Sequence, residues 1–69
     1  MPLVEVTLVE GRSPERLRAL ISGVTKAVEE TIGAPRESVR VVLREVPPSH
    51  WAAGDVTISE SRGLPTPTD

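Results

Sequence analysis

A long amphipathic helix between two short β-rich runs is the feature that most limits how this chain can fold. Ser13 can cap the start of the helix, Pro14 suits its first position, and Gly33 can end it in the left-handed conformation. The apolar residues between these signals recur at the spacing of a single stripe: Leu17, Leu20, Ile21, Val24, Ala27, Val28 and Ile32. The pattern predicts a helix from Pro14 to about Ile32.

A strand is predicted on each side of this helix. Apolar residues alternate with a mixed set from Leu3 to Val9, and valine and leucine alternate with a set that includes two arginines from Ser38 to Val46. A strand, a helix of five turns and a second strand are typical of a βαβ unit, in which the strands are parallel and the crossover is right-handed. The predicted fold class is therefore α+β.

A short hairpin is predicted after the second strand. Pro47-Pro48 stops that strand, and Gly54-Asp55 can form a turn. The run from Val56 to Ile58 is β-rich and can pair with the segment around Trp51. The βαβ unit is thus expected to carry a small C-terminal hairpin.

We expect one domain over residues 1–58 and a flexible tail over residues 59–69, where prolines and small polar residues show no periodicity. A chain of 69 residues without cysteine has no disulfide, and it can bury little surface alone. One helix covers one face of the sheet, so Leu3, Val9 and Val42 need another subunit to bury them. The sequence therefore predicts an oligomer.

Composition argues against several classes of partner and site. The net charge is −2 with both signs interspersed, so the chain lacks the basic stripe of nucleic-acid binders. A single tryptophan without phenylalanine or tyrosine offers no stacking platform for bases, and a single histidine without cysteine argues against structural zinc. No apolar run reaches membrane-spanning length and no signal peptide is recognisable. We expect a cytoplasmic protein with no nucleic-acid or membrane partner.

Pro2 and Arg40 are two candidates for a functional site, although a proline at position two is a weak signal when taken alone. A small second residue usually lets the initiator methionine be removed, which would leave Pro2 with a free secondary amine that can take up and return a proton. Arg40 interrupts a strand face that an oligomer would bury, so its charge requires a carboxylate or an anionic ligand nearby.

Three further residues have two interpretations each. Arg12, in the loop after the first strand, is either a solvated charge or a ligand-binding group. Trp51 is either an interface anchor or the wall of a pocket. His50 has no serine or carboxylate at a spacing that suggests a catalytic triad, so we interpret it as a surface or packing residue.

Several short segments together carry a resemblance to a known family. They are Pro2, Leu8-Val9-Glu10-Gly11-Arg12-Ser13, Ala34-Pro35, Ser38-Val39-Arg40-Val41 and His50-Trp51. In this combination, over residues 2 to 58 and without an insertion, the chain resembles the 4-oxalocrotonate tautomerase family. The resemblance implies a tautomerase/MIF-like βαβ subunit assembled as a hexamer, a trimer of dimers, with active sites between subunits.

The resemblance also implies a role for each candidate residue. Pro2 corresponds to the catalytic base, Arg12 to the arginine that grips a substrate carboxylate, and Arg40 to the arginine near the carbonyl or hydroxyl group. Trp51 stands where family members commonly have phenylalanine and would narrow the apolar side of the pocket. The implied reaction is a cofactor-independent enol–keto proton transfer, without a metal, on an anionic 2-hydroxydienoate or 2-oxo acid such as 2-hydroxymuconate.

The residues fit this chemistry on physical grounds. Nearby arginine cations and an apolar pocket disfavour a charged amine, so they would lower the pKa of an N-terminal Pro2 amine and favour the neutral base. Alternatives remain open: an iminium formed by Pro2 with an aldehyde, a non-catalytic binding protein for an anionic metabolite, or a structural βαβ oligomer. Ala53 and Val9 stand where the related dehalogenases have an added glutamate and arginine, which argues against the hydrolytic branch of the family but leaves a promiscuous, proline-dependent hydratase or aldol-type activity as a further alternative.

Overall fold

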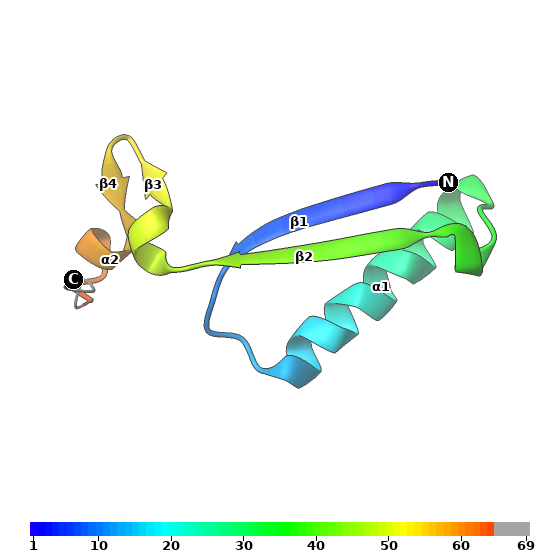
Figure 1. Ribbon diagram of the computed structural model, residues 1–69, viewed down its shortest axis with the longest axis horizontal. Helices are drawn as coiled ribbons and strands as arrows, with labels where there is room; N and C mark the ends of the chain where they lie inside the picture. The colour runs from blue at the N-terminus through cyan, green and yellow to red at the C-terminus, as the bar shows by residue number, and fades with distance from the viewer. Residues whose placement is uncertain (65–69) are drawn as a thin grey trace.

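The computed structural model describes residues 1–64 and shows an α+β fold, as predicted. Two parallel strands, β1 (Leu3–Val9) and β2 (Arg40–Val46), flank the helix α1 (Pro14–Ile32) in the chain. Leu3 pairs with Arg40 and the register continues without interruption to the end of both strands. Figure 1 shows the helix packed along the sheet and the elements that follow β2 gathered at the end of that strand.

The predicted ends of α1 are confirmed. The Ser13 hydroxyl accepts a hydrogen bond of 3.3 Å from the amide of Arg16, and Pro14 occupies the first helical position. Gly33 has φ of 70° and its amide donates to the carbonyl of Glu29. A residue with a side chain would be strained in this left-handed conformation, which explains why glycine ends the helix here.

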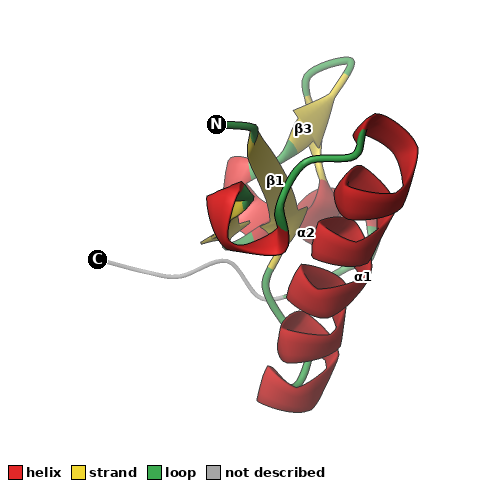
Figure 2. Ribbon diagram, turned by 90° about the vertical axis from the view of Figure 1, so that its right-hand side faces the viewer, coloured by secondary structure: helices red, strands yellow, loops and turns green. Residues whose placement is uncertain are grey.

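The sheet buries one face only. On the side that faces α1, Val4, Val6, Val41 and Leu43 are half-buried, and Leu8 is the one buried apolar residue among residues 1–64. Figure 2 shows α1 on one side of the strands. The opposite face, called the open face below, leaves Leu3 57% and Val42 44% exposed, which leaves apolar surface for another subunit to cover, as the sequence suggested.

The sheet does not cover the whole apolar stripe of α1. Ile32 is 67% exposed in the single chain, and Ala27 is also exposed, although both belong to the predicted stripe. These two positions of the stripe therefore remain uncovered in the single chain.

The second strand begins two residues later than predicted. Ser38 and Val39 were expected in the strand, but Arg36–Ser38 forms a 3-10 turn, η1, and β2 starts at Arg40. The amide and the hydroxyl of Ser38 both donate to the carbonyl of Pro35. Such local hydrogen bonds compete with strand pairing, which explains the difference.

The predicted hairpin is present at the C-terminal end. After the 3-10 turn η2 (Pro48–His50), β3 (Ala52–Ala53) pairs antiparallel with β4 (Val56–Thr57). Gly54 and Asp55 both have positive φ, 58° and 68°, as a two-residue hairpin turn requires.

The expected flexible tail from residue 59 begins instead with helical structure. Helix α2 (Ile58–Ser61) starts at the end of the predicted hairpin strand, and Ser59 is fully buried. The Thr57 hydroxyl accepts from the amide of Glu60, and the Glu60 carboxylate accepts from the amide of Thr57. This capping box starts a helix where composition indicated a tail. Residues 65–69 of the predicted tail lie outside the described residues.

The elements from η2 to α2, called the arm, pack on each other at one end of the molecule (Figure 1). The Cα radius of gyration is 15.6 Å, compared with about 11 Å expected for a compact chain of this length. The subunit is therefore an extended body with a thin core. None of the helices within residues 1–64 has the length and apolar character needed to cross a bilayer.

Candidate active site

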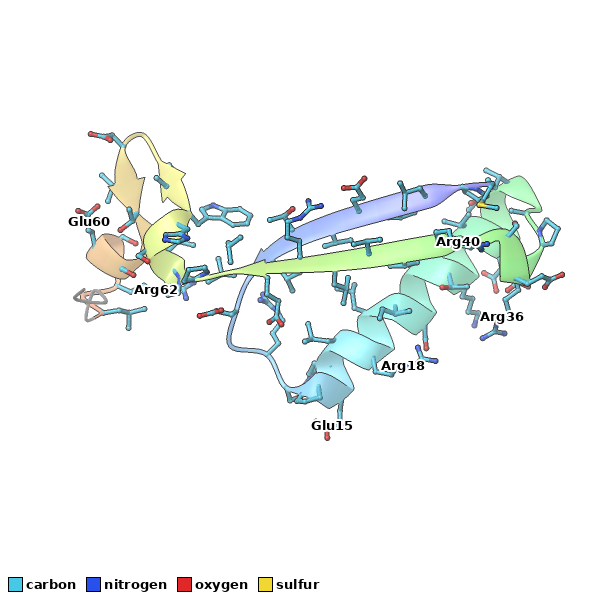
Figure 3. All side chains as sticks on the ribbon, in the orientation of Figure 1. Glu15, Arg18, Arg36, Arg40, Glu60 and Arg62 are labelled. Atoms are coloured by element: carbon cyan, nitrogen blue, oxygen red, sulfur yellow. The ribbon has the colours of Figure 1, made fainter. Side chains whose placement is uncertain are left out.

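The fold joins Pro2 to Arg40 through the backbone. The amide of Arg40 donates a hydrogen bond of 2.9 Å to the carbonyl of Pro2, which continues the parallel ladder at the start of β1. Figure 3 shows Arg40 at the end of the sheet where the N-terminus lies. Met1 precedes this point and is 87% exposed, so the bond that would have to be cut to free the Pro2 amine is accessible.

The side chain of Arg40 belongs to the open face of the sheet. Arg40 pairs with Leu3, and paired residues of a parallel ladder point to the same side. Its Nη1 donates a hydrogen bond of 2.7 Å to the carbonyl of Glu37 in η1. The guanidinium is therefore held by the turn that precedes its own strand.

Arg12 is held in the same way at the other end of β1. Its Nη1 donates a hydrogen bond of 2.9 Å to the carbonyl of Val9. Each of the two arginines thus bonds the carbonyl three residues before it. Since a guanidinium has five donors, Nε and Nη2 of each remain available for an oxyanion.

Within one chain the four candidate residues form two groups. Pro2 and Arg40 lie where the strands begin, whereas Arg12 and Trp51 follow the points where the strands end; there the amide of Glu10 bonds the carbonyl of Val46. Seven residues at about 3.3 Å each place the two ends of β1 roughly 20 Å apart. One chain therefore cannot bring Arg12 next to its own Pro2.

Trp51 lies at the junction between η2 and the hairpin and is partly exposed. Its carbonyl accepts a hydrogen bond of 2.9 Å from the amide of Ile58, which ties it to the start of α2. His50 is exposed, as predicted for a surface residue. Residues 1–64 line no cavity within the single chain, and no group of three or more potential metal ligands occurs among them.

Sequence reasoning missed two features near these residues. One is an ion pair on the open face, where the Arg44 guanidinium lies 3.4 Å from the Glu5 carboxylate. The sequence alone does not show this pair, because the strand register is needed to place Glu5 diagonally from Arg44. The other is Ser38, whose role in the turn before Arg40 follows from its hydrogen bonds and not from its sequence context.

Comparison with known proteins decides the family. The family model described as "Tautomerase enzyme" matches residues 2–61, which include both strands, α1 and the arm. The chain belongs to the tautomerase family. A tautomerase-type function, and hence an isomerase-like enzyme, is supported by this membership.

Relatives of this tautomerase cover nearly its whole length. A protein of Ralstonia nicotianae named a probable tautomerase is 51% identical over 94% of this chain and 93% of its own. TomN, described as a 4-oxalocrotonate tautomerase homologue in the tomaymycin biosynthetic pathway, is 46% identical, with a TM-score of 0.88 over 94% of this chain and 100% of its own.

A third relative is described as a heterohexamer 4-oxalocrotonate tautomerase from Chloroflexus aurantiacus. It is 35% identical, with a TM-score of 0.84 over 87% of this chain and 97% of its own. The resemblance to the 4-oxalocrotonate tautomerase family and the fold that it implied are confirmed.

Proposed function

We propose that this tautomerase catalyses cofactor-independent enol–keto proton transfer on an anionic 2-hydroxydienoate or 2-oxo acid, such as 2-hydroxymuconate. The observation that carries the proposal is the pairing of Pro2 with Arg40 at one end of the sheet, through a 2.9 Å backbone hydrogen bond. This bond fixes an N-terminal proline at the edge of a face that carries a tethered arginine.

Pro2 acts as the general base once Met1 has been removed. In the Met1–Pro2 bond the proline nitrogen is an amide and cannot accept a proton. Removal of the exposed Met1 converts it to a secondary amine. In its neutral form this amine takes a proton from a hydroxyl or an acidic carbon of the substrate and returns it to another carbon of the conjugated system.

Each of the two arginines contacts a different negatively charged group of the substrate. Negative charge grows on the substrate oxygen as the proton leaves, and Arg40 stabilises it with a fixed cation. Arg12 holds a carboxylate in a two-pronged contact through the donors that its bond to Val9 leaves available. Trp51 supplies an apolar wall that excludes water from one side of the substrate.

The complete site forms between subunits of a homohexamer. One chain places Arg12 and Pro2 roughly 20 Å apart along β1, so the groups must come from different copies. The exposed apolar residues Leu3 and Val42 of the open face supply surface for such contacts. The description of the Chloroflexus aurantiacus relative as a heterohexamer supports this assembly size.

An ultraviolet assay of 2-hydroxymuconate ketonisation tests the proposal. Native protein should accelerate the reaction, and Pro2→Ala should lower kcat/KM by about 10²-fold or more, the usual contribution of a general base. No rate above buffer, or full activity of Pro2→Ala, would reject the proposal. Ligand binding that survives Pro2→Ala and falls with either arginine replaced, in a protein without activity, would indicate a binding protein instead.

A further inference from the structure

The turn that leads into β2 contains a hydroxyl group that the proposed reaction does not use. In η1 (Arg36–Ser38) the Ser38 amide donates to the carbonyl of Pro35 at 2.9 Å, and the Ser38 hydroxyl donates to the same oxygen at 2.7 Å. The amide of Val39 donates to the carbonyl of Arg36 at 3.2 Å. The serine side chain thus closes a turn that the backbone already closes.

The same turn holds the side chain of Arg40. The acceptor of Arg40 Nη1, at 2.7 Å, is the carbonyl of Glu37, the middle residue of η1. The backbone of Arg40 is fixed separately by its amide bond to Pro2. The direction of the guanidinium therefore depends on the direction of one turn carbonyl.

We infer that Ser38 is a positioning residue that aims the Arg40 guanidinium by fixing η1. The inference rests on the proposed function, because it requires Arg40 to act on a substrate. Arg40 is exposed in the single chain and has four flexible side-chain torsions, so without an anchor it would sample many directions. With Nη1 held by Glu37, the remaining donors keep one direction.

Arg12 provides an internal comparison. Its Nη1 bonds the carbonyl of Val9, which belongs to β1 and lies at the opposite end of the sheet from η1. A loss of rigidity in η1 should therefore leave the direction of the Arg12 guanidinium unchanged. This difference separates positioning of Arg40 from a general effect on folding.

Kinetics of 2-hydroxymuconate ketonisation test the inference through two double-mutant cycles. Ser38→Ala should lower kcat about fivefold, equivalent to about 1 kcal/mol for one neutral hydrogen bond. The same fivefold loss is expected in the Arg12→Ala background and no further loss in the Arg40→Ala background. Ser38→Thr, which keeps the hydroxyl, should restore kcat.

A second measurement follows the arginine side chains directly. In 15N relaxation, Ser38→Ala should increase the motion of the Arg40 Nε–H group and leave that of Arg12 unchanged. The inference is overturned if Ser38→Ala has the same kcat as native protein, or if Ser38→Ala lowers kcat by the same factor in the native and the Arg40→Ala backgrounds. It is also overturned if Ser38→Ala leaves the motion of the Arg40 Nε–H group unchanged. An inactive native protein would reject the proposed function, while the relaxation data would still decide whether Ser38 holds Arg40.

Discussion

The amide nitrogen of Arg40 lies 2.9 Å from the carbonyl oxygen of Pro2, across the first rung of a parallel ladder. This bond joins the backbone of Pro2 to the start of β2. The side chain of Arg40 lies on the open face, on the same side of the sheet as Leu3.

Replacing the two arginines should separate binding from catalysis. Arg12→Ala is expected to raise KM with little change in kcat, because the proposed contact of Arg12 with a substrate carboxylate would exist in the ground state and in the transition state alike. Arg40→Ala should lower kcat by about 10²-fold, because the proposed role of Arg40 is to stabilise charge that develops only during the reaction. Steady-state kinetics measure both. Arg18→Ala, on the exposed face of α1, is the matched control and should leave KM and kcat unchanged. Equal effects of Arg12→Ala and Arg40→Ala on kcat would contradict these separate roles.

The ion pair on the open face should govern assembly. Arg44 and Glu5 have charged atoms 3.4 Å apart, and Glu5→Arg would replace this ion pair with two neighbouring positive charges where another subunit is expected to cover them. The dissociation constant of the oligomer should therefore rise about tenfold. The double reversal of Glu5 and Arg44 should restore assembly. Sedimentation velocity measures the change.

The exposed pair of Lys26 and Glu30 on α1 supplies the control for this experiment. Their charged atoms are 3.9 Å apart and both side chains are well exposed, so Lys26→Glu should leave assembly unchanged. The role of the open face is contradicted if Glu5→Arg assembles like native protein, or if Lys26→Glu weakens assembly to the same extent.

The capping box should hold the arm that carries Trp51. Thr57→Ala removes the oxygen that accepts from the amide of Glu60 at 3.1 Å, and such a cap contributes about 1 kcal/mol. Hydrogen exchange of the Ile58 amide, which bonds the carbonyl of Trp51, should become about fivefold faster. The amide of Arg40 should keep its protection. Thr57→Ser keeps the cap and should behave like native protein; unchanged exchange in Thr57→Ala would show that packing alone holds the arm.

Local signals made most of the fold predictable from the sequence. Ser13, Pro14 and Gly33 mark both ends of α1 by capping chemistry that acts within one turn, and the structure confirms each of them. The predicted start of β2 was wrong because the Ser38 hydroxyl donates to the nearby carbonyl of Pro35, and this local bond competes with strand pairing. The start of α2 was missed because the Thr57 and Glu60 pair lies inside a segment whose composition resembles a tail.

The candidate site was predictable as a set of residues and less so as an arrangement. The types and order of Pro2, Arg12, Arg40 and Trp51 could be recognised one by one. Their separation into two groups along β1 depends on strand pairing, which the sequence alone does not place, and the proposed site requires other copies of the chain to bring the two groups together. The hydrogen bond from each arginine to the carbonyl three residues earlier could not be predicted from the sequence either.

The central claim is that a free amine on Pro2 performs the proton transfer, and a removable extension tests it most directly. The same protein can be made with a peptide ahead of Pro2 and then cleaved to expose the proline, with mass spectrometry to verify each N-terminus. The extended form should show the native circular dichroism and no ketonisation of 2-hydroxymuconate above buffer, and cleavage should produce the activity. An extended form as active as the cleaved form would contradict the account.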